Sequence, residues 1–213
     1  MNFFKPKFWD KNQISFFSIL LYPDATVCPR LSIAAPVAVL RAIRQVCNIC
    51  PTLKWPNDVI INGKKIAGIL IEMSCEADRI NYVVIGIGVN ANVNIQKIES
   101  HIKETPGYYG STSLMKEVGR EIDRITLVSK IFVELEQIYL ELEKKGSNMI
   151  IQSWKNNSAM LDRNVTITTN EICFEGKAFD IDFDGALLVK LPNGNIERIV
   201  VGDVYVRVKT LKT

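Results

Sequence analysis

One stretch of this sequence constrains the fold more than any other: residues 54–72, which read KWPNDVIINGKKIAGILIE. Two apolar runs flank Asn62-Gly63, a dipeptide that favours a two-residue turn between antiparallel strands. The pattern predicts a β-hairpin. The stretch also carries three charged residues: Lys54 before the first strand, Asp58 in the first strand and Lys65 in the second. A hairpin that only packs into a core does not need these charges.

The two-residue turn sets an expected register for this hairpin. The expected pairs are Ile61 with Lys64, Ile60 with Lys65, and Asp58 with Ala67. Because side chains alternate between the two faces of a strand, Asp58 and Lys65 are expected on one face, as diagonal neighbours with Cβ atoms about 7–8 Å apart. The face of Lys65 is expected to continue along the second strand as Ala67, Ile69 and Ile71.

Two interpretations of the charged pair follow from that spacing. Asp58 and Lys65 form a partial ion pair, or they are held apart and bind a ligand between them. A lysine at this position suits a carboxylate or a phosphate, Asp58 suits a magnesium ion that shields the same phosphates, and Lys54 adds a second positive charge. The alternative is a solvated sheet edge, where lysine also serves to block strand pairing.

A second stretch, GIGVNANV at residues 86–93, ends the next predicted strand. Its spacing, Gly-x-Gly-x-x-Ala without a helical pattern after it, does not match a dinucleotide-binding loop. Glycines at a strand end let a ligand approach the backbone, and Asn90 offers the donor and the acceptor that reading the edge of an adenine requires. The alternative is that Asn90 is a turn residue.

The rest of the chain divides into two parts. Up to residue 157, the patterns predict a sheet with covering helices. The expected elements are a strand at 14–22, a helix at 31–46 that includes Pro36, a strand at 82–89, an irregular connection at 100–123, and helices at 124–145 and 148–155. From residue 161, short alternating runs separated by Asp184-Gly185, Asn193-Gly194 and Gly202-Asp203 predict a small β-barrel. We therefore expect two domains, at 1–157 and 158–213.

Composition argues against several classes of function. Lysine and arginine number 26 against 23 acidic residues, and no long basic block demands a nucleic acid. The longest apolar stretches are shorter than the roughly 20 residues that span a bilayer, and the sequence shows no signal peptide. We therefore expect a cytoplasmic protein with no membrane partner.

Cysteine spacing offers one further candidate site. Cys47-x-x-Cys50 has the spacing of half a zinc site or of a redox pair, but the sequence holds no second such pair, and His101 is its only histidine. The alternative is two buried thiols near the end of a helix.

The two quoted stretches resemble a known family. Residues 54–72, followed by VVIGIGVNANV at 83–93, resemble the signature of biotin–protein ligases, and residues 161–207 are similar to the SH3-like C-terminal domain of that family. The resemblance implies an α+β fold of the class II synthetase and biotin–lipoate ligase type, a mixed sheet with covering helices plus the small barrel. It also implies an enzyme that makes biotinoyl-adenylate from biotin and ATP and then transfers biotin to a lysine of a carboxylase carrier domain.

The same resemblance implies which residues bind biotin. Lys65 matches the catalytic lysine that contacts the biotin carboxylate and the α-phosphate of ATP, where it would stabilise the charge that builds up on phosphorus. Gly68 matches the position at which biotin lies against the strand. Trp9 matches a tryptophan next to the biotin loop and is a further expected substrate contact.

The nucleotide site is expected to include four residues. Lys54 and Asn57 match residues that line the phosphate site, Asp58 matches an acidic residue near the magnesium ion, and Asn90 matches the asparagine that reads adenine. The expected substrates and metal are therefore ATP, biotin and Mg²⁺. The expected partner is the biotin carboxyl carrier domain of a carboxylase, and a homodimer through a sheet edge is a further option.

The N-terminus departs from the family pattern. The family carries a loop rich in arginine and glycine before the tryptophan, whereas MNFFKPKF precedes Trp9 here, and lysine does not reproduce the bidentate fork of arginine. We therefore expect an N-terminally truncated or degenerate ligase without a DNA-binding domain, in which the intermediate leaks or forms slowly. The alternative function is a non-catalytic chain that binds biotin, nucleotide or carrier domain without transfer. A lipoate ligase and a nicotinamide dehydrogenase fit the residues less well.

Overall fold

The computed structural model describes residues 15–76, 79–97, 109–168, 173–200 and 202–206. Trp9 and the segment before it lie outside these ranges, so the role of Trp9 stays a prediction. The domain boundary expected at residue 157 also stays a prediction. Among the described helices, none is long and apolar enough to cross a membrane.

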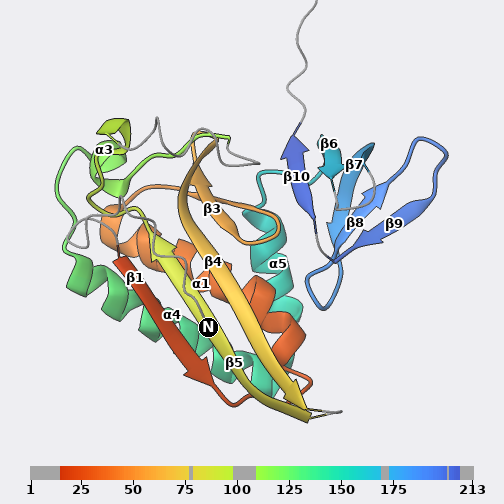
Figure 1. Ribbon diagram of the computed structural model, residues 1–213, viewed down its shortest axis with the longest axis horizontal. Coiled ribbons are helices and arrows are strands. Elements are labelled where there is room, and N and C mark those ends of the chain that lie inside the picture. The colour runs from red at the N-terminus through yellow and green to blue at the C-terminus, as the bar shows by residue number, and fades with distance from the viewer. Residues whose placement is uncertain (1–14, 77–78, 98–108, 169–172, 201, 207–213) are drawn as a thin grey trace, which may run out of the picture.

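A five-stranded sheet forms the centre of the larger part of the chain (Figure 1). Its strands, in spatial order, are β1 (Ser15–Leu21), β5 (Arg79–Val89), β4 (Lys64–Glu76), β3 (Asp58–Ile61) and β2 (Thr52–Lys54). The pairings between these strands are antiparallel. The predicted hairpin is formed by β3 and β4, with Asn62 and Gly63 at its turn, both at positive φ.

Helices cover one face of this sheet (Figure 1). The helix α1 (Leu31–Cys47) packs against α4 (Arg124–Lys145), α5 (Asn148–Asn156) and three of the strands. Small side chains let α1 fit closely between its neighbours, and Ala34, Ala38 and Ala42 are completely buried. The α+β fold class and the three predicted helices are confirmed, with Pro36 inside α1.

Local hydrogen bonds define where α4 begins and ends. The carboxylate of Asp123 accepts from the backbone N–H groups of Ile125 and Thr126, which satisfies donors at the helix start. The helix ends at Gly146, whose φ of 74° favours glycine. The short helices η1 (Cys28–Arg30) and α3 (Leu114–Val118) were not predicted, and α3 lies inside the connection expected to be irregular.

The register of the hairpin departs from the prediction at a β-bulge. The two pairs nearest the turn are as predicted, but beyond them the pairs are Val59 with Ala67 and Asp58 with Gly68. Ile66 is therefore an extra residue in β4. Each residue of β4 beyond it points to the face opposite to the one that the regular register predicted. The predicted pairing of Asp58 with Ala67 was wrong.

The bulge also changes which residues share the face of Lys65. Ala67 and Ile69 are each 2% exposed and belong to the core, so the predicted continuation of that face through them was wrong. Ile71 also packs against the core. The face of Lys65 continues instead as Gly68 and Leu70, and Leu70 is 57% exposed.

A second five-stranded sheet forms the C-terminal part. Its spatial order is β10 (Asp203–Val206), β6 (Asn164–Thr168), β7 (Cys173–Ile181), β8 (Leu187–Lys190) and β9 (Ile196–Ile199). The predicted turns at Gly185 and Gly194 connect β7 to β8 and β8 to β9, each with a φ of 91°, where glycine is strongly favoured. The predicted SH3-like barrel is confirmed.

The turn between β7 and β8 ties the barrel to the larger sheet. Trp55, which follows β2 and is 2% exposed, donates from Nε1 to the carbonyl of Gly185 at 2.9 Å. Arg198 ion-pairs with both Asp182 and Asp184 and so holds this turn together. The tryptophan of the KWPND stretch is therefore a structural contact between the two parts.

Gly185→Ala is expected to destabilise the protein more than Gly194→Ala. Both glycines have a φ of 91°, so alanine is strained similarly at either position. At Gly185 an added Cβ would also lie 2.6 Å from Oγ of Ser32 and 2.9 Å from Cγ2 of Ile33, whereas it would meet nothing within 4 Å at Gly194. We expect the free energies of unfolding, measured in urea, to differ by about 1–3 kcal/mol. Equal losses of unfolding free energy in the two variants would show that the turn at Gly185 does not pack against α1.

Candidate functional site

One row of paired residues crosses the sheet on the face that the helices leave uncovered. From β1 to β2 the row consists of Phe16, Gly88, Gly68, Asp58 and Lys54. The two central positions carry no side chain of their own, so neighbouring side chains lie over the backbone there, Lys65 over Gly68 and Phe16 over Gly88. The ring of Phe16 lies over Gly88, where an added Cβ would be 2.6 Å from a ring carbon. The row therefore has an apolar end, a bare middle and a charged end.

Lys65 and Asp58 meet directly at the charged end of this row. Nζ of Lys65 lies 2.5 Å from Oδ1 of Asp58, and the lysine side chain runs along Gly68, where an added Cβ would be 2.9 Å from Nζ. Asp58 is 7% exposed, so the alternative of a solvated sheet edge was wrong for this residue. Of the two interpretations, the structure has the ion pair.

Tyr109 completes the charged cluster, although no local sequence pattern marks it as a site residue. Its hydroxyl donates to Oδ2 of Asp58 at 2.7 Å, and the ammonium of Lys54 lies 4.3 Å from the centre of its ring. Burial, followed by the negative charge of Asp58 and the hydrogen bond to it, raises the pKa of Tyr109 well above its usual value. The hydroxyl therefore stays protonated and remains a donor. Two lysines and one carboxylate leave this cluster with a net positive charge that suits an anion.

The segment that carries Tyr109 is bonded to the backbone of Lys65. The N–H of Lys65 donates to the carbonyl of Gly110, and the N–H of Thr112 donates to the carbonyl of Lys65, both at 3.0 Å. The extra residue of the bulge takes part as well, since the carbonyl of Ile66 accepts from the N–H of Asn90 at 2.8 Å. The bulge, Lys65 and the end of β5 are thus held in one network.

The two predicted asparagines both bond to backbone groups. Nδ2 of Asn57 donates to the carbonyl of Ile69 at 2.6 Å, and Nδ2 of Asn90 donates to the carbonyl of Thr112 at 3.1 Å. Both side chains are half-buried and lie beside the charged cluster. An amide has a second N–H and an oxygen, so each keeps groups with which to contact a ligand.

Asn92 has a structural role that sequence reasoning missed. It is 8% exposed, its Nδ2 donates to the carbonyl of Ile122, and its Oδ1 accepts from the N–H of the same residue, both at 2.9 Å. This paired contact fixes the connection that leads into α4. Nothing in the local sequence distinguishes Asn92 from Asn90, because the distinction arises from a partner thirty residues away.

Both cysteines of the Cys47-x-x-Cys50 pair are free thiols in the structure. Cys47 is buried and Cys50 is exposed, so the alternative of two buried thiols was correct only for Cys47. Burial also raises the pKa of the Cys47 thiol, which makes it less reactive. In the part of the chain that the structure describes, no three histidine, cysteine or carboxylate side chains gather around a metal position.

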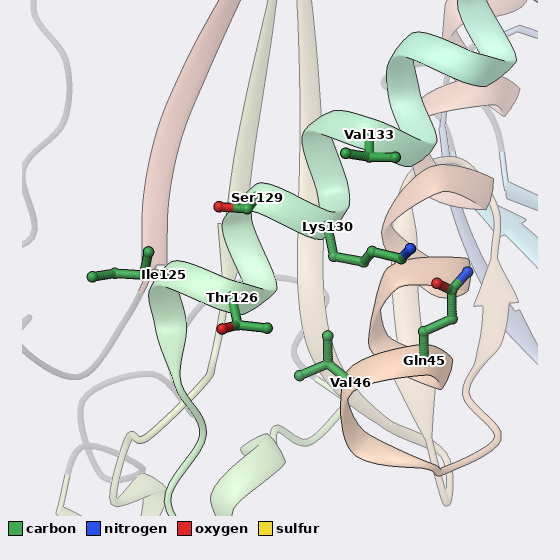
Figure 2. A pocket seen from close by; sticks show the side chains of 7 residues that line it. All are labelled: Gln45, Val46, Ile125, Thr126, Ser129, Lys130 and Val133. Atoms are coloured by element: carbon green, nitrogen blue, oxygen red, sulfur yellow. The ribbon is translucent and has the colours of Figure 1, made fainter.

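A hollow of approximately 650 Å³ lies between α1 and α4 (Figure 2). It contains none of the predicted site residues, and Lys130 is its one charged lining residue. The side chains that line it are those of Gln45, Val46, Ile125, Thr126, Ser129, Lys130 and Val133. Both helices cover the other face of the sheet, so this hollow is separate from the charged cluster.

Two family models match the chain. The Biotin/lipoate A/B protein ligase family matches residues 7–90, and the Biotin protein ligase C terminal domain matches residues 160–207. The chain belongs to the biotin protein ligase family. The first match contains every predicted site residue, and the second coincides with the barrel.

Individual relatives agree with this assignment. The chain is 35% identical over 191 residues to the bifunctional ligase/repressor BirA of Bacillus subtilis (strain 168), a match that covers 89% of this chain and 57% of that protein. It is 29% identical over 181 residues to the biotin–(acetyl-CoA-carboxylase) ligase of Paracoccus denitrificans, covering 83% of this chain and 74% of that protein. The chain thus spans little more than half the length of the Bacillus relative.

The fold is also similar to a solved structure, that of biotin protein ligase from Aquifex aeolicus in complex with biotin and ATP. The two chains are 25% identical, with a TM-score of 0.76, and the match covers 92% of this chain and 78% of the other. This similarity confirms the predicted fold for both parts of the chain.

Asn92→Ala is expected to destabilise the protein by about 2 kcal/mol or more, because it leaves a buried N–H and a buried carbonyl of Ile122 without partners. The control is Asn156→Ala, which removes an exposed side-chain contact with Gln152 and should change stability by about 0.5 kcal/mol at most. Urea unfolding of both variants measures the difference. Similar losses would contradict the assigned role of Asn92.

Proposed function

We propose that this chain attaches biotin to a lysine of a carboxylase carrier domain, using ATP to form biotinoyl-adenylate. The observation that supports this most directly is the position of Lys65. Its ammonium lies over the bare backbone of Gly68 and beside the buried carboxylate of Asp58, at the positive end of an open row. That arrangement suits a ligand with an apolar body and an anionic end.

The proposed reaction has two steps. A carboxylate oxygen of biotin attacks the α-phosphorus of ATP, and pyrophosphate leaves. The amine of the carrier lysine then attacks the acyl carbon, and AMP leaves as the amide bond forms. Lys65 is the proposed catalytic residue, because an ammonium at this position brings the two anions together and stabilises the charge that develops on phosphorus.

The proposed biotin site uses the bare middle of the row. Gly68 and Gly88 are paired across neighbouring strands, so a flat ligand can lie against the backbone there once the side chains of Lys65 and Phe16 move aside. Phe16 is 61% exposed at the apolar end of the row and offers its ring to the same ligand. The biotin carboxylate would then point toward Lys65.

The proposed nucleotide site uses the residues around the charged cluster. Lys54 supplies a second positive charge for the phosphates, Asn57 lies beside it, and Asn90 reads the edge of adenine at the end of β5. This proposal is supported by the half-buried position of both amides and by the remaining hydrogen-bonding groups that each retains.

Asp58 is the proposed ligand of a magnesium ion that arrives with ATP. Magnesium is usually held by one or two carboxylates together with substrate phosphates. Oδ1 of Asp58 is a buried oxygen that accepts no hydrogen bond, although Lys65 ion-pairs with it, so it fits a cation of this kind. Such an ion would shield the negative charge of the phosphates.

The biotin carboxyl carrier domain of a carboxylase is the proposed partner, in keeping with the printed name of the Paracoccus relative. A homodimer through a sheet edge and a cytoplasmic location stay predictions from the sequence.

Lys65→Ala is expected to reduce biotin transfer by about a hundredfold to a thousandfold, since it removes the cation that acts on the developing charge. The control is Lys64→Ala, which removes the exposed neighbouring lysine and should leave transfer unchanged. The measurement is the intact mass of a purified carrier domain after incubation with protein, biotin, ATP and magnesium. A Lys65→Ala variant with full activity would contradict the role of Lys65.

The wild-type protein in the same assay separates the two functions expected from the sequence. A carrier domain that gains one biotin supports the ligase. Binding of biotin or ATP by calorimetry without any gain in mass, while a control ligase works, supports the non-catalytic alternative and overturns the proposed activity.

A further inference from the structure

Lys65 occupies the position that the anionic end of a ligand needs. Its side chain runs along Gly68, and its ammonium is 2.5 Å from Oδ1 of Asp58. A carboxylate that approaches over Gly68 meets the side chain of Lys65 and competes with Asp58 for its ammonium. Movement of the ammonium away from Asp58 leaves a residue that is 7% exposed without the cation that balances its charge.

Removing one partner of a buried ion pair is costly, because the remaining charge is neither paired nor solvated. Before a magnesium ion arrives with ATP, a group of the protein must stabilise Asp58 after Lys65 has moved. The Tyr109 hydroxyl is in position to do this, since it donates to Oδ2 of Asp58, whereas Lys65 pairs with Oδ1. A hydrogen bond to an ionised group is also about twice as strong as one between neutral groups.

We propose that Tyr109 is a positioning residue that holds and stabilises Asp58 while Lys65 leaves that carboxylate for the anionic group of the substrate. The inference rests on the proposed ligase function, which gives Lys65 a carboxylate to move to. Tyr109 acts through Asp58 and Lys65 and takes no part in bond making.

The surroundings of Tyr109 are suited to this role. Its ring contacts Lys54, whose ammonium lies 4.3 Å from the ring centre, and its hydroxyl donates to Asp58. The next residues bond to the backbone of Lys65 on both sides, through Gly110 and Thr112, so the backbone of Lys65 stays in place while its side chain moves. Thr112 also accepts from Asn90, which links Tyr109 to the proposed adenine contact.

The test compares biotin with biotinol, the analogue in which a hydroxyl replaces the carboxylate. Wild-type protein is expected to prefer biotin, because only the carboxylate draws Lys65 from Asp58. The preference is the dissociation constant of biotinol divided by that of biotin. In Tyr109→Phe, which keeps the ring and removes the hydroxyl, we expect this ratio to fall by about fivefold or more, with little change in the affinity for biotinol. Calorimetry without nucleotide gives both dissociation constants.

Two further variants distinguish this role from a general structural one. Tyr139→Phe removes a hydroxyl that bonds to Glu143 on α4 and should leave the preference unchanged. In an Asp58→Asn background no charge remains to be stabilised, so adding Tyr109→Phe should have no effect. Asp58→Asn alone should retain at least the wild-type preference, which provides a test even where Tyr109→Phe does not fold.

The outcomes separate the inference from the function on which it rests. A wild type that binds neither compound overturns the proposed function, and the inference with it. A wild type that prefers biotin, together with a Tyr109→Phe variant that keeps the full preference, overturns the inference alone. Equal weakening of biotin and biotinol also overturns it, because the effect would then not act through the carboxylate.

Discussion

A single extra residue in β4, Ile66, determines which side chains of the hairpin meet the core and which meet the open face. Because of the bulge, Ile66 and Ala67 are both buried, while Gly68 returns to the face of Lys65 and lies opposite Asp58. In a regular hairpin Ala67 would occupy the position of Gly68 beside this pair. The bulge is held by the N–H of Asn90, so the end of β5 and the charged cluster depend on the same backbone contact.

The KWPND stretch combines packing with chemistry in neighbouring residues. Trp55 is buried and bonds to the barrel turn, whereas Lys54 and Asp58 on either side of it face the open row. The position of the charged cluster is therefore tied to the docking of the C-terminal part through Trp55. This arrangement gives a physical reason for a tryptophan between two functional residues, since its large apolar surface and single N–H donor anchor the strand.

Much of the fold could be predicted from local patterns. The Asn62-Gly63 turn, the apolar period of α1 and the glycine turns of the barrel each have a signal within a few residues. The bulge has none, because it arises when segment 110–112 and Asn90 bond to β4, and these lie far away along the chain. Tyr109 and Asn92 were missed for the same reason: their roles depend on Asp58 and Ile122, which no local pattern connects to them. Lys65 and Asp58 could be predicted because they are charged residues within a hairpin whose strands are otherwise apolar, a pattern visible in the local sequence.

The most direct test of this account is a crystal structure of the protein with biotin bound. The account predicts that biotin lies over Gly68 and Gly88, that Nζ of Lys65 has left Asp58 and contacts the biotin carboxylate, and that the Tyr109 hydroxyl still donates to Asp58. Biotin bound elsewhere on the protein, or a Lys65 that remains paired with Asp58 beside the bound ligand, would contradict it.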